Sequence, residues 1–112
     1  MEKHEIKALN AMKGHCEDII SFTQHKTYEE FENNKMLNNA TIFSVLQIGE
    51  LTKELDANFR NTYTQIQWHK IYGLRNRLAH DYEGVSMLMI WRFVTKNIPE
   101  LKKDIEAIIE KN

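Results

Sequence analysis

Arg75 and His80 are the two side chains whose types and spacing best suit acid–base chemistry on a phosphate group. A histidine titrates near neutral pH and can move a proton, and an arginine presents a planar fork of donors to phosphate oxygens. Five residues of an ideal helix turn the chain by about 500°, so the two side chains point roughly 140° apart. Two compatible explanations remain open. Either the helix ends near Leu78 and His80 lies on a turn, or two copies of the chain meet across a two-fold axis.

The stretch around this pair, residues 68–82, is locally basic in a chain whose formal net charge is −1. Three lysines and arginines against one aspartate give the stretch a charge of +2. Aromatic side chains alternate with these groups, so the stretch could bind a phosphate backbone and stack bases. The alternative is a solvated face whose last histidine is favoured by the helix dipole. The residues concerned are Trp68, His69, Lys70, Tyr72, Arg75, Arg77, His80, Asp81 and Tyr82.

Other kinds of site are not indicated by the sequence. Cys16 lies on an apolar stripe without a cationic neighbour suited to activate a thiol, so it is interpreted as a packing residue. The five histidines form neither HxxxH nor HExxH, and no phosphate-binding loop or nucleophile-elbow motif occurs. We therefore expect neither a metal nor a cofactor.

Length and composition favour a single domain spanning residues 1–112. With a net charge of −1, nucleic acid would have to be bound by a local patch rather than by the whole molecule. The longest strictly apolar run, residues 87–91, is far too short to cross a membrane, and the first ten residues lack the apolar core of a secretory signal. These features predict a cytoplasmic protein that does not associate with membranes.

The elements that must position the basic stretch are helices, because strand-like alternation is nearly absent and the chain has four glycines and one proline. Apolar residues recur at steps of three and four over residues 5–24, and a capping-box spacing at Thr27 and Glu30 starts a short second helix. A third helix is expected over residues 35–58, with Met36, Phe43 and other apolar residues on a broad buried face. Gly49 within it either permits a close helix crossing or is simply tolerated.

Three further helical segments complete the expected fold. One begins near Gln67 and carries the basic stretch, one begins after Ser86 as its cap, and the last begins at Pro99. Residues 58–65 are expected to form the least ordered connection. The sequence therefore predicts an all-α, mostly antiparallel bundle of about five helices.

At the basic stretch the sequence resembles the HepT-like branch of the HEPN superfamily. The family pattern is an arginine, a polar residue, three further residues, a histidine, one residue and a tyrosine, which Arg75, Asn76, His80 and Tyr82 match here. The lead-in "IQWHKIYGLRN" is also similar, with Gln67 where the family often has proline. "IGE" at 48–50 and "IPELKKDIEAI" at 98–108 resemble the family's central and last helices, so the similarity covers nearly the whole chain.

The resemblance implies a helical bundle that forms a homodimer or higher oligomer, with both copies of the motif lining a cleft between subunits. It implies a metal-independent RNase that acts as the toxin of a toxin–antitoxin pair, with Arg75 and His80 as catalytic residues. The antitoxin would be an MntA-like minimal nucleotidyltransferase that transfers AMP from ATP to the motif tyrosine, here Tyr82. Supporting contacts to RNA are expected from Asn76, Lys70, Arg77 and Asp81.

Several roles stay open. Asp81 either orients His80 or solvates the turn, and Tyr82 either stacks a base or caps the core at the helix end. Glu50 is a weaker candidate, because a lone acid in a long helix is usually solvated or paired. The whole chain could alternatively serve as a non-catalytic helical partner of a nucleotidyltransferase, or as a plain dimeric scaffold.

Overall fold

Every regular element of the computed structural model, which describes residues 1–112, is helical. This confirms the all-α prediction, and none of the helices combines the length and apolar character needed to cross a membrane. Seven α-helices and one π-helical segment follow one another: α1 (Lys3–Thr23), α2 (Tyr28–Asn33), α3 (Lys35–Thr52), α4 (Ala57–Thr62), α5 (Trp68–His80), α6 (Met87–Arg92), η1 (Phe93–Asn97) and α7 (Ile98–Glu110).

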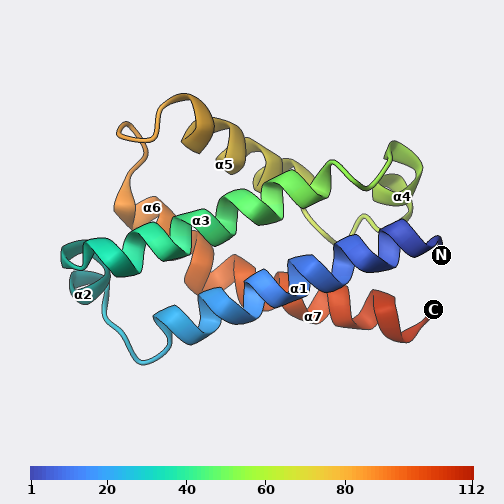
Figure 1. Ribbon diagram of the computed structural model, residues 1–112, viewed down its shortest axis with the longest axis horizontal. Coiled ribbons are helices and arrows are strands. Elements are labelled where there is room, and N and C mark those ends of the chain that lie inside the picture. Colours follow the sequence, from blue (N-terminus) through green and yellow to red (C-terminus); the bar gives the residue numbers. More distant parts are fainter.

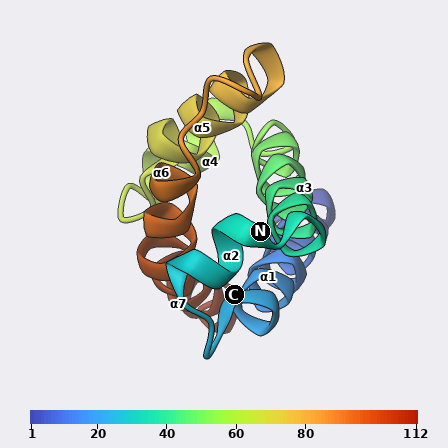
Figure 2. The same ribbon diagram turned by 90° about the vertical axis from the view of Figure 1, so that its left-hand side faces the viewer.

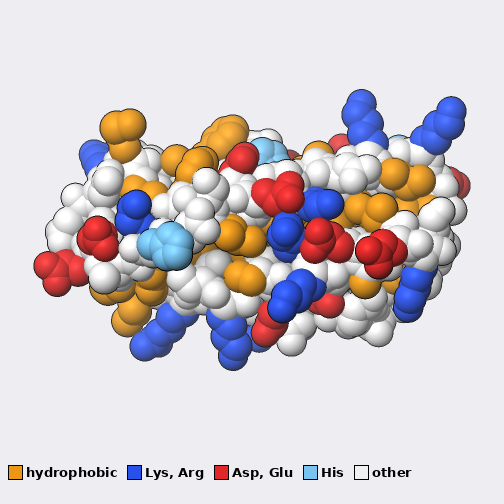
Figure 3. Space-filling model, turned by 90° about the horizontal axis from the view of Figure 1, so that it is seen from below, with side chains coloured by type: hydrophobic (Ala, Val, Ile, Leu, Met, Phe, Trp, Pro, Cys, Tyr) orange, Lys and Arg blue, Asp and Glu red, His pale blue; other side chains and the backbone are white.

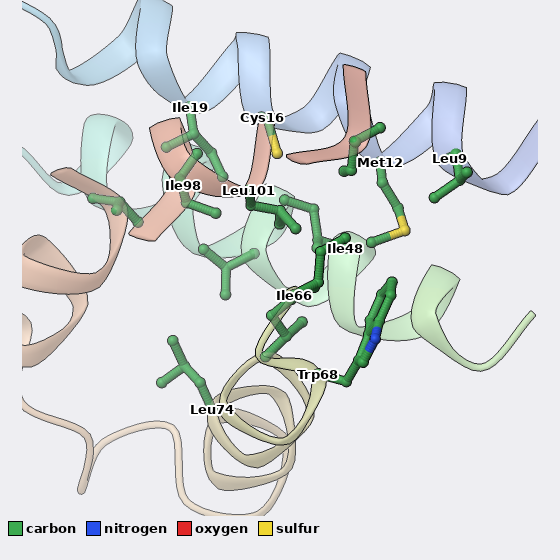
Figure 4. Packing of buried hydrophobic residues seen from close by; sticks show 14 of the residues in the cluster. Leu9, Met12, Cys16, Ile19, Ile48, Ile66, Trp68, Leu74, Ile98 and Leu101 are labelled. Atoms are coloured by element: carbon green, nitrogen blue, oxygen red, sulfur yellow. The ribbon is translucent and has the colours of Figure 1, made fainter. Parts of the chain in front are cut away.

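The helices surround one elongated core (Figures 1 and 2). Helix α1 packs along α3 on one side and along α7 on the other, while α5 packs on α3. The core side chains of α1, such as Met12 and Ile19, face Ile98 of α7 and Ile48 of α3, and Trp68 enters from α5 (Figure 4). Burying a side chain of this size contributes roughly 1.5–3 kcal/mol, so this shared core holds α5 and its motif in place.

The predicted α1 stripe and the capping box of α2 are both confirmed. Cys16 is fully buried in the stripe, and burial raises the pKa of its thiol to about 12, which suits packing and not reactivity. At α2 the Thr27 hydroxyl accepts a hydrogen bond from the Glu30 N–H at 3.1 Å, and Glu30 accepts one from the Thr27 N–H at 2.9 Å. Each cap satisfies a backbone donor that the helix itself leaves free.

The predicted third helix over residues 35–58 is wrong in its extent, and so is the predicted loop at 58–65. Helix α3 ends at Thr52, and α4 occupies most of the expected loop. The Asp56 carboxylate caps α4 by accepting a hydrogen bond from the Phe59 N–H at 2.9 Å. The Arg60 guanidinium reaches back to the Leu55 carbonyl at 2.8 Å and satisfies an acceptor in the break between the helices.

The two segments that were expected to begin at Ser86 and at Pro99 form one continuous helical segment. Ser86 caps α6 as predicted, and Pro99 lies in the first turn of α7 as predicted. The two helices are joined without a break by η1, a π-helical stretch. Pro99 has no N–H to donate to the carbonyl four residues earlier, which accounts for a widened hydrogen-bond register just before it.

The face formed by α1 and α7 carries interspersed acidic and basic side chains (Figure 3). Lys13 lies 3.5 Å from Glu106, and Lys102 lies 3.9 Å from Glu17, so the opposite charges pair between the two helices. This confirms the last segment as a helix with one wet, charged face. Since neither sign of charge dominates there, this face does not resemble a nucleic-acid surface.

Candidate active site on helix α5

The motif lies on α5, which stays helical through His80 and is followed by Asp81 at its C-cap. The expectation that the helix ends near Leu78 is therefore wrong. Leu74 and Leu78 bury the inner face of α5 in the core, which fixes the rotation of the helix. With an unbroken helix between them, Arg75 and His80 leave α5 in directions about 140° apart.

Arg75 lies where α5 crosses α3 at close range. A Cβ atom on Gly49 would overlap the Cβ and Cγ of Arg75, so this glycine permits a close crossing, one of the two interpretations of the sequence. The Arg75 guanidinium pairs with Glu50 through Nη2 and donates to the Asn76 side-chain oxygen through Nη1 at 3.0 Å. Its Nε atom is buried without a hydrogen-bond partner. Arg75 is thus held by contacts within its own chain.

Replacing Gly49 by alanine should disturb this crossing. The added methyl group meets the base of the Arg75 side chain, not its flexible end, so α5 must shift. We expect a loss of about 1–3 kcal/mol in the free energy of unfolding, measured by urea denaturation. Gly14→Ala is the matched control, because nothing lies within 4 Å of its Cβ position and alanine favours a helix by about 0.5–1 kcal/mol. Equal effects of the two substitutions would contradict the close crossing.

Glu50 was only a weak candidate from the sequence, and the structure gives it a partner. The hydrogen bond from Arg75 is the main reason that the pKa of the Glu50 carboxyl lies below its ordinary value of 4.5, with Lys53 at 3.5 Å contributing further. A carboxyl whose pKa is lowered by folding stabilises the fold above the unfolded pKa. This stabilisation is lost as the pH falls through the folded pKa. The ion pair is therefore intact at neutral pH.

Thermal unfolding of Glu50→Gln should reveal this linkage. We expect the variant to melt below the unmodified chain at pH 7, and the difference in Tm should shrink as the pH is taken below 4.5. Circular dichroism melts at several pH values provide the measurement. Glu54→Gln, an exposed neighbour without an ion pair, is the control and should show little difference throughout. A constant gap in Tm down to pH 3 for Glu50→Gln would contradict the linkage.

His80 is exposed at the end of α5 and lines a shallow hollow of about 270 Å³ together with Asn76 and Arg77. The wall opposite is the turn that follows the helix. There the Asp81 carboxylate accepts a hydrogen bond from the Gly84 N–H at 3.1 Å. A Cβ on Gly84 would overlap this carboxylate, so a larger residue there would displace the Asp81 side chain. The sequence left Asp81 either to orient His80 or to solvate the turn; this contact instead gives Asp81 the role of organising the turn.

Tyr82 reaches from the end of α5 to α3. Its hydroxyl donates a hydrogen bond to the Asn39 side-chain oxygen at 2.8 Å, and the residue is 40% exposed. Tyr82 therefore does not cap the core. Its phenol oxygen lies on the surface between two helices, held by one exposed amide.

Lys70 and Arg77 do not join Arg75 within one chain. Arg77 contacts the Met89 sulfur of α6 at 3.4 Å, and Lys70 lines a small cavity that also contains Glu100 and Asp104. Both lie on the side of α5 that faces α6 and α7, away from α3. The structure thus separates the predicted supporting cations from the Arg75–Glu50 pair.

The expected broad apolar face of α3 is only partly buried. Met36 is 85% exposed and Phe43 is 58% exposed, although both were predicted to face the core. They are seven residues apart and so lie on the same side of the helix. Asn39, between them, is the residue that holds Tyr82. We refer to Met36 and Phe43 as the exposed α3 stripe, an apolar surface beside the motif tyrosine.

Comparison with known proteins identifies the family of the chain. Residues 12–108 match the family described as "Ribonuclease HepT-like". A protein of Methanocaldococcus jannaschii named "Putative RNase MJ0125" is 40% identical over 111 residues, covering 98% of this chain and 96% of the relative. A "Probable ribonuclease HepT" of Thermococcus cleftensis is 32% identical over 90 residues, covering 80% of this chain and 82% of the relative. No solved structure matches. The chain therefore belongs to the HepT-like family of ribonucleases.

Proposed function

We propose that the chain is a metal-independent endoribonuclease that acts as the toxin of a toxin–antitoxin pair and is neutralised by AMP transfer to Tyr82. Family membership supports the ribonuclease activity. The observation that carries the mechanism is the intact motif on one unbroken helix, with Arg75 and His80 presented on different sides.

This divergence is the reason to propose a homodimer. One chain cannot aim both groups at the same phosphodiester, whereas a two-fold axis brings the same surface of each copy face to face. The exposed α3 stripe supports this arrangement, because apolar side chains beside the motif would be covered by the second copy. The proposed cleft then contains two copies of Arg75 and two of His80.

The proposed reaction uses the 2′-hydroxyl of RNA as the nucleophile. Neutral His80 takes the 2′-hydroxyl proton while the oxygen attacks phosphorus, and the protonated His80 of the partner subunit gives a proton to the leaving 5′-oxygen. Arg75 donates to the phosphorane oxygens, with Asn76 adding a hydrogen bond. The products are a 2′,3′-cyclic phosphate and a 5′-hydroxyl. No step requires a metal.

Cleavage of a labelled single-stranded RNA in the presence of EDTA tests this function. We expect products that end in a 2′,3′-cyclic phosphate, and no cleavage of the same sequence as DNA or as 2′-O-methyl RNA. Cleavage that stops in EDTA, or that proceeds without the 2′-hydroxyl, would overturn the mechanism. Absence of any cleavage together with tight binding to a nucleotidyltransferase would favour the non-catalytic alternative.

Replacing Phe43 by glutamate should separate the two subunits. A charge on the exposed α3 stripe would be buried without a partner in the proposed dimer, which costs several kcal/mol. We expect light scattering to report a monomer and RNA cleavage to fall by at least about 10²-fold, because the cleft is lost. Leu88→Glu, at an exposed apolar residue on α6, is the control and should leave the mass unchanged. An active Phe43→Glu monomer would rule out the shared cleft.

Regulation at Tyr82 is supported by its position. The hydroxyl is at the surface and its one hydrogen-bond partner is the exposed Asn39, so a transferase could reach it without unfolding the chain. Tyr82 directly follows Asp81, which lines the hollow that contains His80. An adenylyl group on Tyr82 would bring bulk and negative charge to that site.

A further inference from the structure

A second hollow, much larger than the one at His80, is lined by residues from the end of α3, from α4 and the loop after it, and from the first half of α5. Its volume is about 840 Å³, within the range of small-molecule sites. It lies where α3 stops at Thr52 and α4 begins at Ala57, the same break that the sequence did not predict. We call it the α4 pocket, lined among others by Lys53, Arg60, His69, Tyr72 and Asn76.

The charge of the α4 pocket has one sign. Lys53, Arg60 and His69 line it, and no aspartate or glutamate does. Arg60 is already fixed, since its guanidinium donates to the Leu55 carbonyl at 2.8 Å. Lys53 and His69 are exposed, and Lys53 also lies 3.5 Å from the Glu50 carboxylate outside the pocket. In a chain of net charge −1, a cavity lined by basic side chains and by no acidic one indicates an anionic ligand.

Aromatic rings complete the pocket. Trp68 forms part of the wall and is held there by a hydrogen bond from its indole N–H to the Tyr63 carbonyl at 3.0 Å. Tyr72, one turn later, is only half-buried and offers its ring to the cavity. Cations beside an available aromatic ring are the combination that binds a phosphate and stacks a base.

The α4 pocket continues toward His80 along one side of α5. His69, Gly73, Asn76 and His80 are spaced by four, three and four residues, so they lie in one line along the helix. Asn76 lines both the α4 pocket and the hollow at His80. The two hollows are therefore neighbours on one surface. Gly73 in the first hollow and His80 in the second are separated by roughly 11 Å along the axis of α5.

We infer that the α4 pocket is a subsite for a nucleotide that flanks the cleaved linkage of an RNA strand. The base stacks on Tyr72, and its phosphate lies between Lys53 and His69. The strand then follows α5 past Asn76 to His80. This inference rests on the proposed ribonuclease function and adds to it the place where the strand is held outside the reacting linkage.

The test is binding of a fluorescent 2′-O-methyl RNA of twelve nucleotides, measured by anisotropy in EDTA, so that cleavage does not enter. We expect Tyr72→Leu and His69→Ala each to weaken binding about tenfold. Tyr72→Phe keeps the ring and should retain the affinity, which separates stacking from damage to the fold. Lys103→Ala, at an exposed lysine of α7, is the charge-matched control and should bind as the unmodified chain does.

The outcomes separate this inference from the proposed function. Unchanged affinity in both Tyr72→Leu and His69→Ala overturns the subsite, while RNA cleavage by the same proteins would leave the ribonuclease proposal intact. Failure of the unmodified chain to bind the oligonucleotide also overturns the subsite. AMP binding that depends on Tyr72, with no effect of the same substitution on the oligonucleotide, would assign the pocket to a free nucleotide and overturn the RNA subsite.

Discussion

Replacing His80 by alanine is expected to lower the rate of RNA cleavage by about 10²–10⁴-fold with little change in stability. The side chain is exposed at the end of α5, so its removal leaves no cavity in the core. In the proposed mechanism, its loss removes the group that takes the 2′-hydroxyl proton and, in the second subunit, the group that protonates the leaving oxygen. Single-turnover cleavage of labelled RNA in EDTA measures the effect.

Arg75→Ala should reduce cleavage by about 10²–10³-fold through a different step, the loss of donors to the phosphorane. Arg75→Lys should not restore full activity, because a lysine cannot present the planar fork. Arg92→Ala and His4→Ala, at exposed residues distant in sequence from the motif, are matched controls. If His80→Ala and Arg75→Ala cleave as fast as these controls, the motif has no part in the chemistry.

Local sequence signals predicted the elements that carry the motif. The α1 stripe, the Thr27–Glu30 capping box and the Ser86 cap depend on residues within one or two turns of each other, and each was confirmed. The start of α5 near Gln67 was predicted correctly for the same reason. Periodicity and capping are local properties, so a single sequence contains enough information to find them.

Contacts between distant parts of the chain were not predictable in this way. Arg75 pairs with Glu50, and Tyr82 pairs with Asn39, 43 residues away. No spacing rule connects such positions before the crossing of α3 and α5 is known. Gly49 was the available signal, because a glycine inside a helix can mark a close approach, but it did not identify α5 as the neighbour.

The two errors on α3 have a common physical origin. Apolar residues were assumed to be buried, so Met36 and Phe43 were assigned to the core, and the helix was extended to include Leu55. The structure leaves the first two exposed and places Leu55 after the helix end. Asp56 was the overlooked signal, since an aspartate before a helical run is a typical N-cap. Both errors concern surface features of the structure, namely the exposed α3 stripe and the α4 pocket.

Co-expression with an MntA-like nucleotidyltransferase should abolish RNA cleavage by the chain and add the mass of adenylyl groups at Tyr82. The phenol oxygen attacks the α-phosphate of ATP and pyrophosphate leaves, so a neutral hydroxyl becomes an anionic phosphodiester. The Asn39 hydrogen bond is lost in this step, because the hydroxyl hydrogen is replaced. Tyr82 is the residue after Asp81, which lines the His80 hollow, so we expect the new phosphate to compete with the RNA phosphate for cationic groups. Intact mass spectrometry and the EDTA cleavage assay on the same sample measure both effects.

Tyr82→Phe separates neutralisation from catalysis. The substitution keeps the ring and removes only the acceptor of AMP and the hydrogen bond to Asn39, so the purified variant should still cleave RNA. In the presence of the transferase, Tyr82→Phe should carry no AMP and remain toxic, whereas the chain with its natural Tyr82 should be silenced. Tyr28→Phe, at a half-buried tyrosine bonded to Glu32, is the matched control and should still be neutralised. Silencing of Tyr82→Phe by the transferase would move the regulation from this hydroxyl to the docking of the partner itself.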